Sequence, residues 1–357
     1  MLTIQELKIE GFKKVIEASD PEAKLHCIIA IHNTTLGPAL GGARIKTYES
    51  RDEALVDVLR LAKAMTYKSA IAGTGFGGGK SVVIAGPEER NDELLLAFGK
   101  AVDSLEGAYI VAEDVGSSTK DMEVIHRSTP YVAARDIDKS SGDPSRFTAW
   151  GVFKGMEATA KVLWGSPSLH GKVIAIQGLG NVGGKLAEIL FWAGAKLILS
   201  EVNDHKLHEY ANLYGAKTIN TDQFCFIECD FLAPCALGGI VSPEIIPKLN
   251  CKAIVGGANN QFSQPSCGEL LLECGILYAP DYIVNAGGLI NVGVELSGDG
   301  YDPNIAREKV SAIYDIVIDI LDQSVRKKIA TNVLADQLAE YNLQHQIGKR
   351  QKLLHFD

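Results

Sequence analysis

The chain has 357 residues, of which 46% are hydrophobic and 22% charged, and its formal net charge is -9 at pH 7. This length and composition suit a globular protein with two domains, each large enough to bury its own core. The charge is spread along the chain without a block of Lys or Arg, which argues against a nucleic-acid footprint or an anionic-membrane surface. Small-molecule chemistry is therefore the expected activity.

The cysteines and the first residues bear on the compartment. Seven cysteines, an odd number, occur at irregular spacings without a C-x-x-C pair, which predicts reduced thiols and neither a metal site nor a redox motif. Glu6, Lys8 and Glu10 stand where a signal peptide would need an apolar core, and no apolar run approaches the length of a membrane span. A cytoplasmic protein is expected.

The first part of the chain alternates strand-like and helix-like segments. The best-marked helix is predicted over about 51–67, because Ser50 and Glu53 form a capping-box pattern ahead of an apolar stripe. The end of this helix presents Lys68. The other elements predicted here are strands over 24–31, 81–84 and 109–112 and a helix over 93–105. This alternation indicates an α/β domain.

A polar stretch rich in helix breakers, Asp136–Arg146, is interpreted as the junction to a second domain. Beyond it, strand-like runs alternate with helical segments, which is typical of a parallel sheet wound with helices on both faces. Those runs are Val173–Gln177, Lys196–Ser200 and Ala253–Gly256. The predicted domains are 1–145 and 146–330. A helical, amphipathic stretch over about 304–340 follows, and the sequence leaves open whether residues 331–357 pack back on the first domain.

The strand Val173–Gln177 leads directly into a dinucleotide-binding pattern, Gly178-Leu-Gly180-Asn181-Val182-Gly183, and Val182 opens a predicted helix that ends at Ala193. In such a motif the first glycine permits a tight turn, the second lets backbone amides approach a pyrophosphate, and the third allows close packing of the helix. A chance glycine turn would lack this strand and helix in register.

An acidic residue completes the pattern, since Glu201 lies 23 residues after Gly178, where a carboxylate can bind the hydroxyl groups of the adenosine ribose. The carboxylate would repel a 2′-phosphate, so NAD is predicted in preference to NADP.

A second glycine-rich segment, 72–81, resembles a nucleoside-triphosphate P-loop at first sight. The register fails, because Thr74 stands where that motif needs glycine, and the segment follows a helix and precedes a strand, the reverse of the required order. The remaining interpretation is a flexible loop that places Lys80 near a ligand. A lysine screened from water near other positive charge has a lowered pKa and can act as a base. A solvated loop lysine is the alternative.

Six motifs in matching order resemble the glutamate/leucine/phenylalanine/valine dehydrogenase family over nearly the whole chain, and the chain length is closest to its leucine branch. They are Met65-Thr-Tyr-Lys68, Gly77-Gly-Gly-Lys80, Ala112-Glu-Asp114-Val-Gly116, Gly178-Leu-Gly180-Asn-Val-Gly183, Gly256-Gly-Ala-Asn-Asn260 and Asn285-Ala-Gly-Gly288. The resemblance implies two domains separated by a cleft, an N-terminal α/β substrate and oligomerisation domain and a Rossmann-type NAD-binding domain. It also implies a homo-oligomer, an octamer or a dimer.

The resemblance further implies roles for individual residues. Lys68 would pair with the substrate α-carboxylate, Lys80 would activate the water that attacks the iminium carbon, and Asp114 would exchange protons with the amino nitrogen. For Asp114 a turn or helix cap is the alternative interpretation. The cofactor contacts implied by the family motifs are Gly178, Gly180, Asn181, Val182, Gly183, Glu201, Cys235, Ala236, Ala258, Asn259 and Asn285.

The expected substrate is a branched-chain aliphatic amino acid, oxidised to the 2-oxo acid, ammonia and NADH. Family members that take glutamate have a lysine where this chain has Leu40, so the end of the pocket is apolar. Leucine enzymes commonly have the smaller valine at the position of Leu289. Valine and phenylalanine dehydrogenases of the same family therefore remain alternatives. The expected substrate contacts are Leu40, Gly41, Met65, Lys68, Ala112, Leu289 and Val292.

The sequence fits two other classes of function less well. A catalytically silent NAD-binding regulator is disfavoured because every chemical position is intact. A hydroxy-acid dehydrogenase would use a His base with a carboxylate and an Arg. His126 is followed by Arg127, but on a predicted surface helix.

Overall fold

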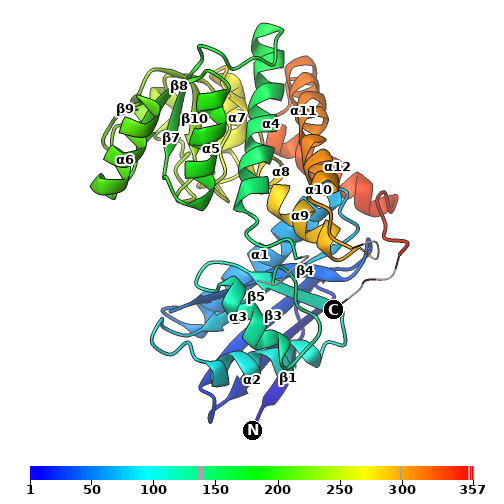
Figure 1. Ribbon diagram of the computed structural model, residues 1–357. Helices are drawn as coiled ribbons and strands as arrows, with labels where there is room; N and C mark the ends of the chain where they lie inside the picture. Colours follow the sequence, from blue (N-terminus) through cyan, green and yellow to red (C-terminus); the bar gives the residue numbers. More distant parts are fainter. Residues whose placement is uncertain (136–139, 298–299, 353, 355, 357) are drawn as a thin grey trace. The chain divides into compact units, whose positions relative to one another are not determined.

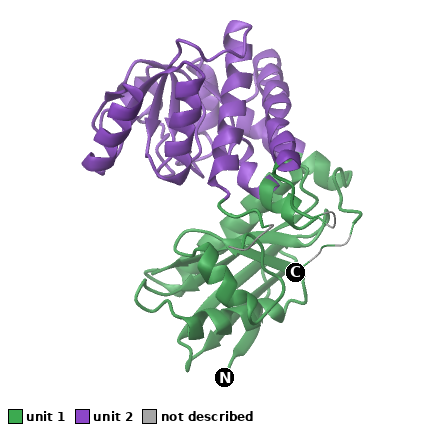
Figure 2. Cartoon of the chain, in the orientation of Figure 1, with its two compact units in different colours: residues 1–143, 291–303, 339–357 green, residues 144–290, 304–338 purple. Residues whose placement is uncertain are grey.

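The computed structural model describes residues 1–135, 140–297, 300–352, 354 and 356. The chain forms two compact units (Figure 2). Unit 1 contains Met1–Asp143, Asn291–Pro303 and Ala339–Asp357, and unit 2 contains Pro144–Ile290 and Asn304–Leu338. Of the expected junction, residues 136–139 lie outside the described residues. The units differ from the expected boundaries in that Asn291–Pro303, within the predicted 146–330, belongs to unit 1.

Unit 1 is built on a mixed sheet (Figure 1), in the order β1-β2-β3-β5-β4-β6 within the described residues. The strands from β1 to β5 along this order are antiparallel, whereas β4 runs parallel to both β5 and β6. The strand bounds are Thr3–Leu7 (β1), Lys14–Asp20 (β2), Leu25–Asn33 (β3), Ala39–Lys46 (β4), Gly77–Ile84 (β5) and Tyr109–Glu113 (β6). The three strands predicted in this part of the chain are confirmed.

The prediction of a flexible glycine loop before Lys80 is wrong, because strand β5 already begins at Gly77 and its glycines are buried. A Cβ atom on Gly77 would lie 2.0 Å from the carbonyl oxygen of Asn33, and one on Gly78 would lie 2.1 Å from the backbone nitrogen of Thr66. The glycines therefore serve close packing against a neighbouring strand and a helix. The need for glycine at these positions comes from tertiary contacts, which the local sequence does not show.

That helix, α1 (Arg51–Ile71), covers one face of the sheet. Its N-cap is the predicted Ser50, whose hydroxyl accepts a hydrogen bond from the Glu53 backbone N–H at 3.1 Å. The Glu53 carboxylate accepts from the N–H of Glu49, so the capping box is only half formed. The buried side of α1 packs against alternate residues of the sheet in one cluster, which includes Val58 and Ala62 of α1 with Ile28, Ala30 and Val82.

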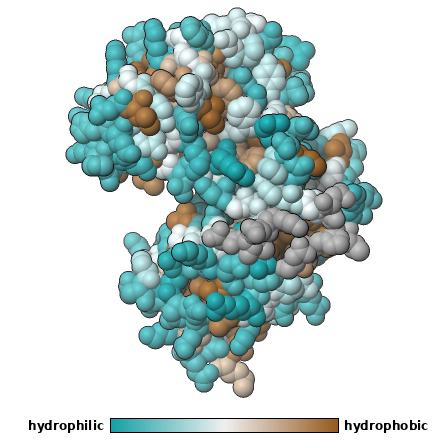
Figure 3. Space-filling view, in the orientation of Figure 1, coloured by the Kyte–Doolittle hydropathy of each residue, from teal (hydrophilic) through white to brown (hydrophobic). Residues whose placement is uncertain are grey.

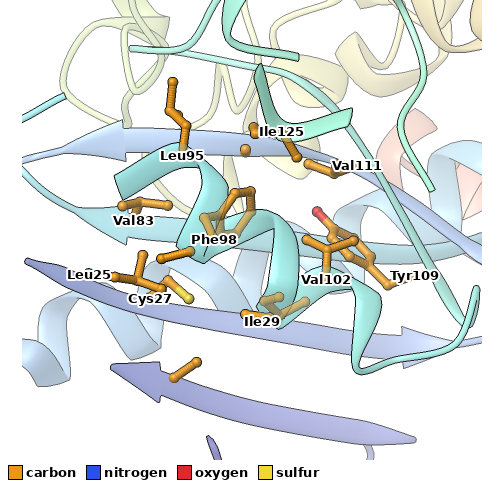
Figure 4. Packing of buried hydrophobic residues seen from close by; sticks show 14 of the residues in the cluster. Leu25, Cys27, Ile29, Val83, Leu95, Phe98, Val102, Tyr109, Val111 and Ile125 are labelled. Carbon is orange, nitrogen blue, oxygen red and sulfur yellow. The ribbon is translucent and has the colours of Figure 1, made fainter. Parts of the chain in front are cut away.

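The other face is covered by α2 (Asp92–Asp103) and α3 (Thr119–His126). Phe98 and Val102 of α2 belong to the same buried cluster as Ile29, Val83 and Tyr109 of the sheet (Figure 4). Side chains alternate between the faces of a strand. Because Val82 faces α1 and Val83 faces α2, Lys80 lies on the α1 face.

Unit 2 contains a parallel sheet in the order β12-β11-β10-β7-β8-β9. This is the strand order of the Rossmann fold, which binds ligands where the order reverses, here at β7 and β10. The strand bounds are Val173–Gln177 (β7), Lys196–Ser200 (β8), Lys217–Thr218 (β9), Cys229–Pro234 (β10), Cys251–Ile254 (β11) and Leu277–Tyr278 (β12). The predictions for β7 and β8 are confirmed at both ends, and the third predicted strand starts two residues early as β11.

Helices lie around this sheet (Figure 1), and further helices follow its last strand in the chain, up to Gln344. The helices are Ser145–Trp164 (α4), Asn181–Trp192 (α5), Asp204–Tyr214 (α6), Cys267–Glu273 (α7), Asp281–Val284 (α8), Gly287–Glu295 (α9), Pro303–Ser311 (α10), Ile313–Lys327 (α11) and Thr331–Gln344 (α12). The predicted helical stretch over 304–340 is thus divided among the last three.

The face of the molecule in Figure 3 is mostly hydrophilic, with apolar residues in separate groups. Among the described helices, none has the length and apolar character needed to cross a membrane.

The C-terminal residues of unit 1 hold the segment that leads into β5. The guanidinium of Arg350 donates to the carbonyl oxygens of Thr74 and Gly75 at 3.1 and 3.2 Å and lies 4.2 Å from the ring centre of Phe76. Its backbone N–H donates to the carbonyl of Leu36, just before β4. One residue therefore connects the segments that precede the neighbouring strands β4 and β5.

We expect Arg350→Met to lower the free energy of unfolding by about 1–3 kcal/mol, because it removes two hydrogen bonds and a cation–π contact while keeping an apolar stem. Urea denaturation followed by circular dichroism measures the change. Arg326→Met on the exposed side of α11 is the matched control. If Arg350→Met lowers the free energy of unfolding no more than Arg326→Met does, Arg350 does not stabilise the segments before β4 and β5.

Candidate active site

Three neighbouring strands of unit 1 bring polar side chains to one face of the sheet. In the register of the strands, Gly42 on β4 pairs with Ala112 on β6, and Ala43 on β4 pairs with Ser81 on β5. Lys80 therefore lies on one side of Gly42, and Asp114, two residues beyond Ala112, lies near its other side. The alternation of side chains places Lys80, Arg44 and Asp114 on the same face.

Lys80 and Asp114 form an ion pair across β4, with 3.0 Å between Lys80 Nζ and Asp114 Oδ2. The Lys80 side chain is 7% exposed and that of Asp114 is 19% exposed. Gly42 leaves the room for this pair, because a Cβ atom there would lie 2.6 Å from Asp114 Cβ and 3.2 Å from Lys80 Nζ. The backbone of β4 thus passes beneath the pair without a side chain.

The surroundings shift the pKa values of both groups. Burial lowers the pKa of Lys80, and the charge of Arg44 lowers it further, against the opposing effect of Asp114. For Asp114, burial would raise the pKa, but the charges of Lys80 and Arg44 outweigh it and bring the pKa below its usual value. The site therefore holds a carboxylate beside an amine that gives up its proton more readily than an ordinary lysine.

The sequence reasoning missed Arg44, which contacts this pair, and Asp57, which binds Arg44. Arg44 Nε donates to Asp114 Oδ2 at 3.0 Å, and its Nη1 donates to Asp57 Oδ2 on α1 at 3.0 Å. The Tyr48 hydroxyl also donates to Asp57 Oδ2, at 2.9 Å. The available signal was the two-residue spacing from Gly42 to Arg44 within a strand, which puts both on one face. Nothing in the sequence pointed to Asp57.

Several predicted substrate residues lie in the same part of unit 1. Leu40 is buried on β4, and Ala112 is half-buried at the end of β6. The carbonyl of Gly41 accepts a hydrogen bond from the buried Tyr109 hydroxyl at 2.9 Å. The close approach of Gly78 to Thr66 brings the C-terminal part of α1 against β5.

The remaining predicted substrate residues lie on two helices. Met65 and Lys68 are half-buried near the C-terminal end of α1. Leu289 and Val292 are buried on α9. Leu289 belongs to unit 2, whereas Val292 belongs to unit 1.

In unit 2 the predicted dinucleotide motif has the required geometry. Gly178 has a φ of +87°, which favours glycine, and its N–H donates to the carbonyl of Ser200 at 2.8 Å. A Cβ atom on Gly183 would lie 1.9 Å from the carbonyl oxygen of Gly178. A Cβ atom on Gly180 would meet nothing within 4 Å, so the turn before α5 is open on that side.

Glu201 follows β8 and turns its carboxylate toward the glycine turn. It accepts hydrogen bonds from the backbone N–H groups of Leu179, Val202 and Asn203 at 2.7, 2.8 and 3.1 Å. Burial would raise the pKa of Glu201, but these three donors lower it, so the group is an anion at neutral pH.

The other predicted cofactor residues gather at the same edge of the sheet. Ala236, after β10, is the nearest neighbour of a Cβ atom on Gly178, and the Cys235 N–H donates to the carbonyl of Gln177 at 2.8 Å. Asn285 Nδ2 donates to Asn259 Oδ1 at 2.9 Å, and the Ala258 N–H donates to the carbonyl of Pro234.

These residues fit a dinucleotide such as NAD(P). The N-terminal N–H groups of α5, which begins at Asn181, have no acceptors within the helix and can bind phosphate oxygens. Within the described part of the chain, the buried atoms Gln177 Oε1 and Ser200 Oγ have no hydrogen-bond partner, and both lie at strand ends beside the turn. No group of three or more His, Cys, Asp or Glu suited to a metal ion occurs among the described residues.

Comparisons with known sequences match both units. Residues 13–131 match the Glu/Leu/Phe/Val dehydrogenase dimerisation domain, and residues 196–343 match the Glutamate/Leucine/Phenylalanine/Valine dehydrogenase family. The chain belongs to this family. It is therefore an NAD(P)-dependent amino-acid dehydrogenase that acts on CH–NH2 donors and, with a dimerisation domain, a homo-oligomer.

Individual relatives cover almost the whole chain. The leucine dehydrogenase of Geobacillus stearothermophilus is 46% identical over 335 residues, 93% of this chain and 91% of the relative. The phenylalanine dehydrogenase of Caldalkalibacillus thermarum (strain TA2.A1) is 42% identical over 353 residues, with coverage of 96% and 94%. The crystal structure of L-tryptophan dehydrogenase from Nostoc punctiforme matches with a TM-score of 0.81 at 40% identity, over 95% of this chain and 97% of that one.

We expect Gly42→Ala to lower kcat about 100-fold, because the new Cβ atom would push Asp114 away from Lys80 and small displacements of reacting groups are costly. Steady-state kinetics with the best amino-acid substrate measures this. In the matched control, Gly86→Ala, the Cβ atom would meet only the flexible ends of the Glu88 and Glu89 side chains. Full activity of Gly42→Ala would show that the geometry across β4 is unimportant.

Proposed function

We propose that this chain is an NAD-dependent dehydrogenase that oxidatively deaminates a branched-chain aliphatic L-amino acid to the 2-oxo acid and ammonia, with leucine preferred over valine and isoleucine. The buried pair of Lys80 and Asp114 across Gly42 carries the proposal, because it places a lysine of lowered pKa beside a carboxylate. Such a pair suits proton transfer in two directions.

In this proposal Lys68 binds the α-carboxylate of the substrate through its ammonium group. Asp114 accepts a proton from the substrate ammonium group, so that the nitrogen lone pair can form the iminium bond. The bound nicotinamide supplies the acceptor for the hydride that leaves the α-carbon. Lys80 then takes a proton from a water molecule as that water attacks the iminium carbon. Collapse of the carbinolamine, with a proton returned to the nitrogen, releases ammonia and the 2-oxo acid.

The choice of an aliphatic substrate rests on the apolar residues that the family motifs assign to the substrate side chain. Leu40 is 1% exposed beside Gly41, and by the family resemblance we assign to it, with Met65, Ala112, Leu289 and Val292, the recognition of the substrate side chain. A charged side chain would lose its hydration there without a partner, which is costly. The higher identity to the leucine enzyme than to the phenylalanine enzyme supports leucine.

A second candidate is a valine or phenylalanine dehydrogenase of the same family. Leu289 changes the volume proposed for the pocket, and one methylene group changes discrimination by only about 1–3 kcal/mol. Preferences among aliphatic substrates are therefore expected to overlap. We also infer that the homo-oligomer is an octamer or a dimer.

The proposed choice of cofactor rests on Glu201, whose anionic carboxylate would repel the 2′-phosphate of NADP. The proposed contacts of NAD are the turn Gly178, Gly180, Asn181, Val182 and Gly183, with Glu201, Cys235, Ala236, Ala258, Asn259 and Asn285.

We expect a substrate panel with NAD to give the highest kcat/KM for leucine, lower values for valine and isoleucine, and the lowest for glutamate. Each amino acid is mixed with enzyme and NAD or NADP at alkaline pH, and the absorbance of the reduced nicotinamide is followed. NADP should give slower turnover than NAD. If phenylalanine or tryptophan gives the highest kcat/KM, the aliphatic assignment is wrong. If no amino acid is turned over, the proposed dehydrogenase activity is wrong.

We expect Lys80→Ala to lower kcat about 100-fold to 10,000-fold, because a positioned base contributes that much. In the wild type, kcat for deamination should rise with pH as Lys80 loses its proton. This rise should have its midpoint below 10.5, the ordinary pKa of lysine. Lys100→Ala on the exposed side of α2 serves as the control. Retained activity in Lys80→Ala would remove Lys80 from the chemistry.

A further inference from the structure

The two oxygens of Asp114 have unequal surroundings. Oδ2 accepts from both Lys80 Nζ and Arg44 Nε, each at 3.0 Å. Oδ1 accepts no hydrogen bond from the part of the chain that the structure describes. The carboxylate is therefore bound along one side only, with its second oxygen available to a ligand.

Arg44 is itself held firmly. Its Nη1 donates to Asp57 Oδ2, and the side chains of Arg44 and Asp57 are only 16% and 14% exposed. Asp57 is in turn bound by Arg60 at Oδ1 and by Tyr48 at Oδ2, both at 2.9 Å. The planar guanidinium therefore bridges two carboxylates, one on α1 and one after β6. A guanidinium can hold two partners in a rigid geometry, whereas an ammonium group acts as a point charge.

We propose that Arg44 is a positioning residue, which anchors Asp114 Oδ2 to Asp57 of α1 and so keeps Oδ1 as the oxygen that exchanges the proton with the substrate nitrogen. This inference rests on the proposed function, in which Asp114 is the proton acceptor. In this arrangement Arg44 does not touch the substrate, and it exerts its positioning effect through Asp114.

The charge of Arg44 has a second effect, on Lys80. Arg44 lowers the pKa of Lys80, after the larger effects of burial and of Asp114, so loss of its charge raises that pKa. Loss of Arg44 also raises the pKa of Asp114. Among the described residues, the charged or titratable groups around the pair include Arg44, Asp57, Arg60, Tyr48, Tyr109 and Glu113. Of these, Arg44 contacts Asp114 directly.

The test separates the charge of Arg44 from its geometry. Arg44→Met removes both, and Arg44→Lys keeps the charge but cannot bridge two carboxylates. Asp57→Asn keeps Arg44 and weakens only its anchor. Arg60→Met is the matched control, because Arg60 contacts Asp57 but not Asp114 and its side chain is half exposed. Circular dichroism and NAD binding show which variants are folded.

We expect Arg44→Met to lower kcat about 100-fold with little change in KM, and to move the rising limb of kcat to higher pH. Arg44→Lys should restore the position of that limb without restoring kcat. Asp57→Asn should lower kcat by a smaller factor, and Arg60→Met should stay near the wild type. If Arg44→Met does not fold, the contrast between Arg44→Lys and Arg60→Met decides the question.

Asp114→Ala distinguishes failure of this inference from failure of the proposed function. If Asp114→Ala is inactive while the Arg44 variants keep wild-type kcat and pH dependence, Arg44 has no positioning role and only this inference is overturned. If Asp114→Ala keeps full activity, the role proposed for Asp114 is wrong and the inference falls with it. Equal losses in Arg44→Met and Arg60→Met would indicate a purely structural effect through Asp57.

Discussion

The site in unit 1 depends on the close approach of strands β4 and β5 and helix α1, which glycine permits at several adjacent positions. A Cβ atom on Gly41 would lie 1.9 Å from the carbonyl oxygen of Gly79, and one on Gly78 would lie 2.1 Å from the backbone nitrogen of Thr66. These distances leave no room for any side chain. At Gly42 the same absence of a side chain lets Lys80 and Asp114 meet across the strand. Backbone packing therefore creates the space that the chemistry uses.

Charge balance is the second requirement, because buried charges are costly unless they are paired and hydrogen-bonded. Lys80 and Arg44 face Asp114, and Arg44 continues to Asp57, so that two cations alternate with two anions across β5, β4, β6 and α1. Burial remains the largest influence on Lys80 and lowers its pKa even beside a carboxylate. The arrangement thus stabilises the ionised form of Asp114, while the pKa of Lys80 stays below that of an ordinary lysine.

In unit 2 the order of consecutive elements in the sequence is almost enough to predict the geometry of the dinucleotide motif. The strand, the glycine turn and the helix follow one another directly, so their relative placement is set by the turn itself. The strand β7 and the turn at Gly178 occur where the sequence predicted them, and Glu201 reaches back to the turn through its hydrogen bond from the Leu179 N–H. The strand order then adds Cys235 and Ala236, which directly follow β10, the neighbour of β7 in the sheet.

The sequence by itself determined the fold class and the dinucleotide motif, because periodicity, caps and short motifs are local properties, whereas Asp114 and the catalytic role of Lys80 were predicted from the resemblance to the family. It could not determine that the glycines before Lys80 form a buried strand, since their reason is the position of Thr66 and Asn33 in the fold. It also could not identify Arg44 as a partner of Asp114, or Asp57 as the residue that holds Arg44. Their contacts join β4, α1 and the end of β6, segments far apart in the chain, and only tertiary packing brings them together.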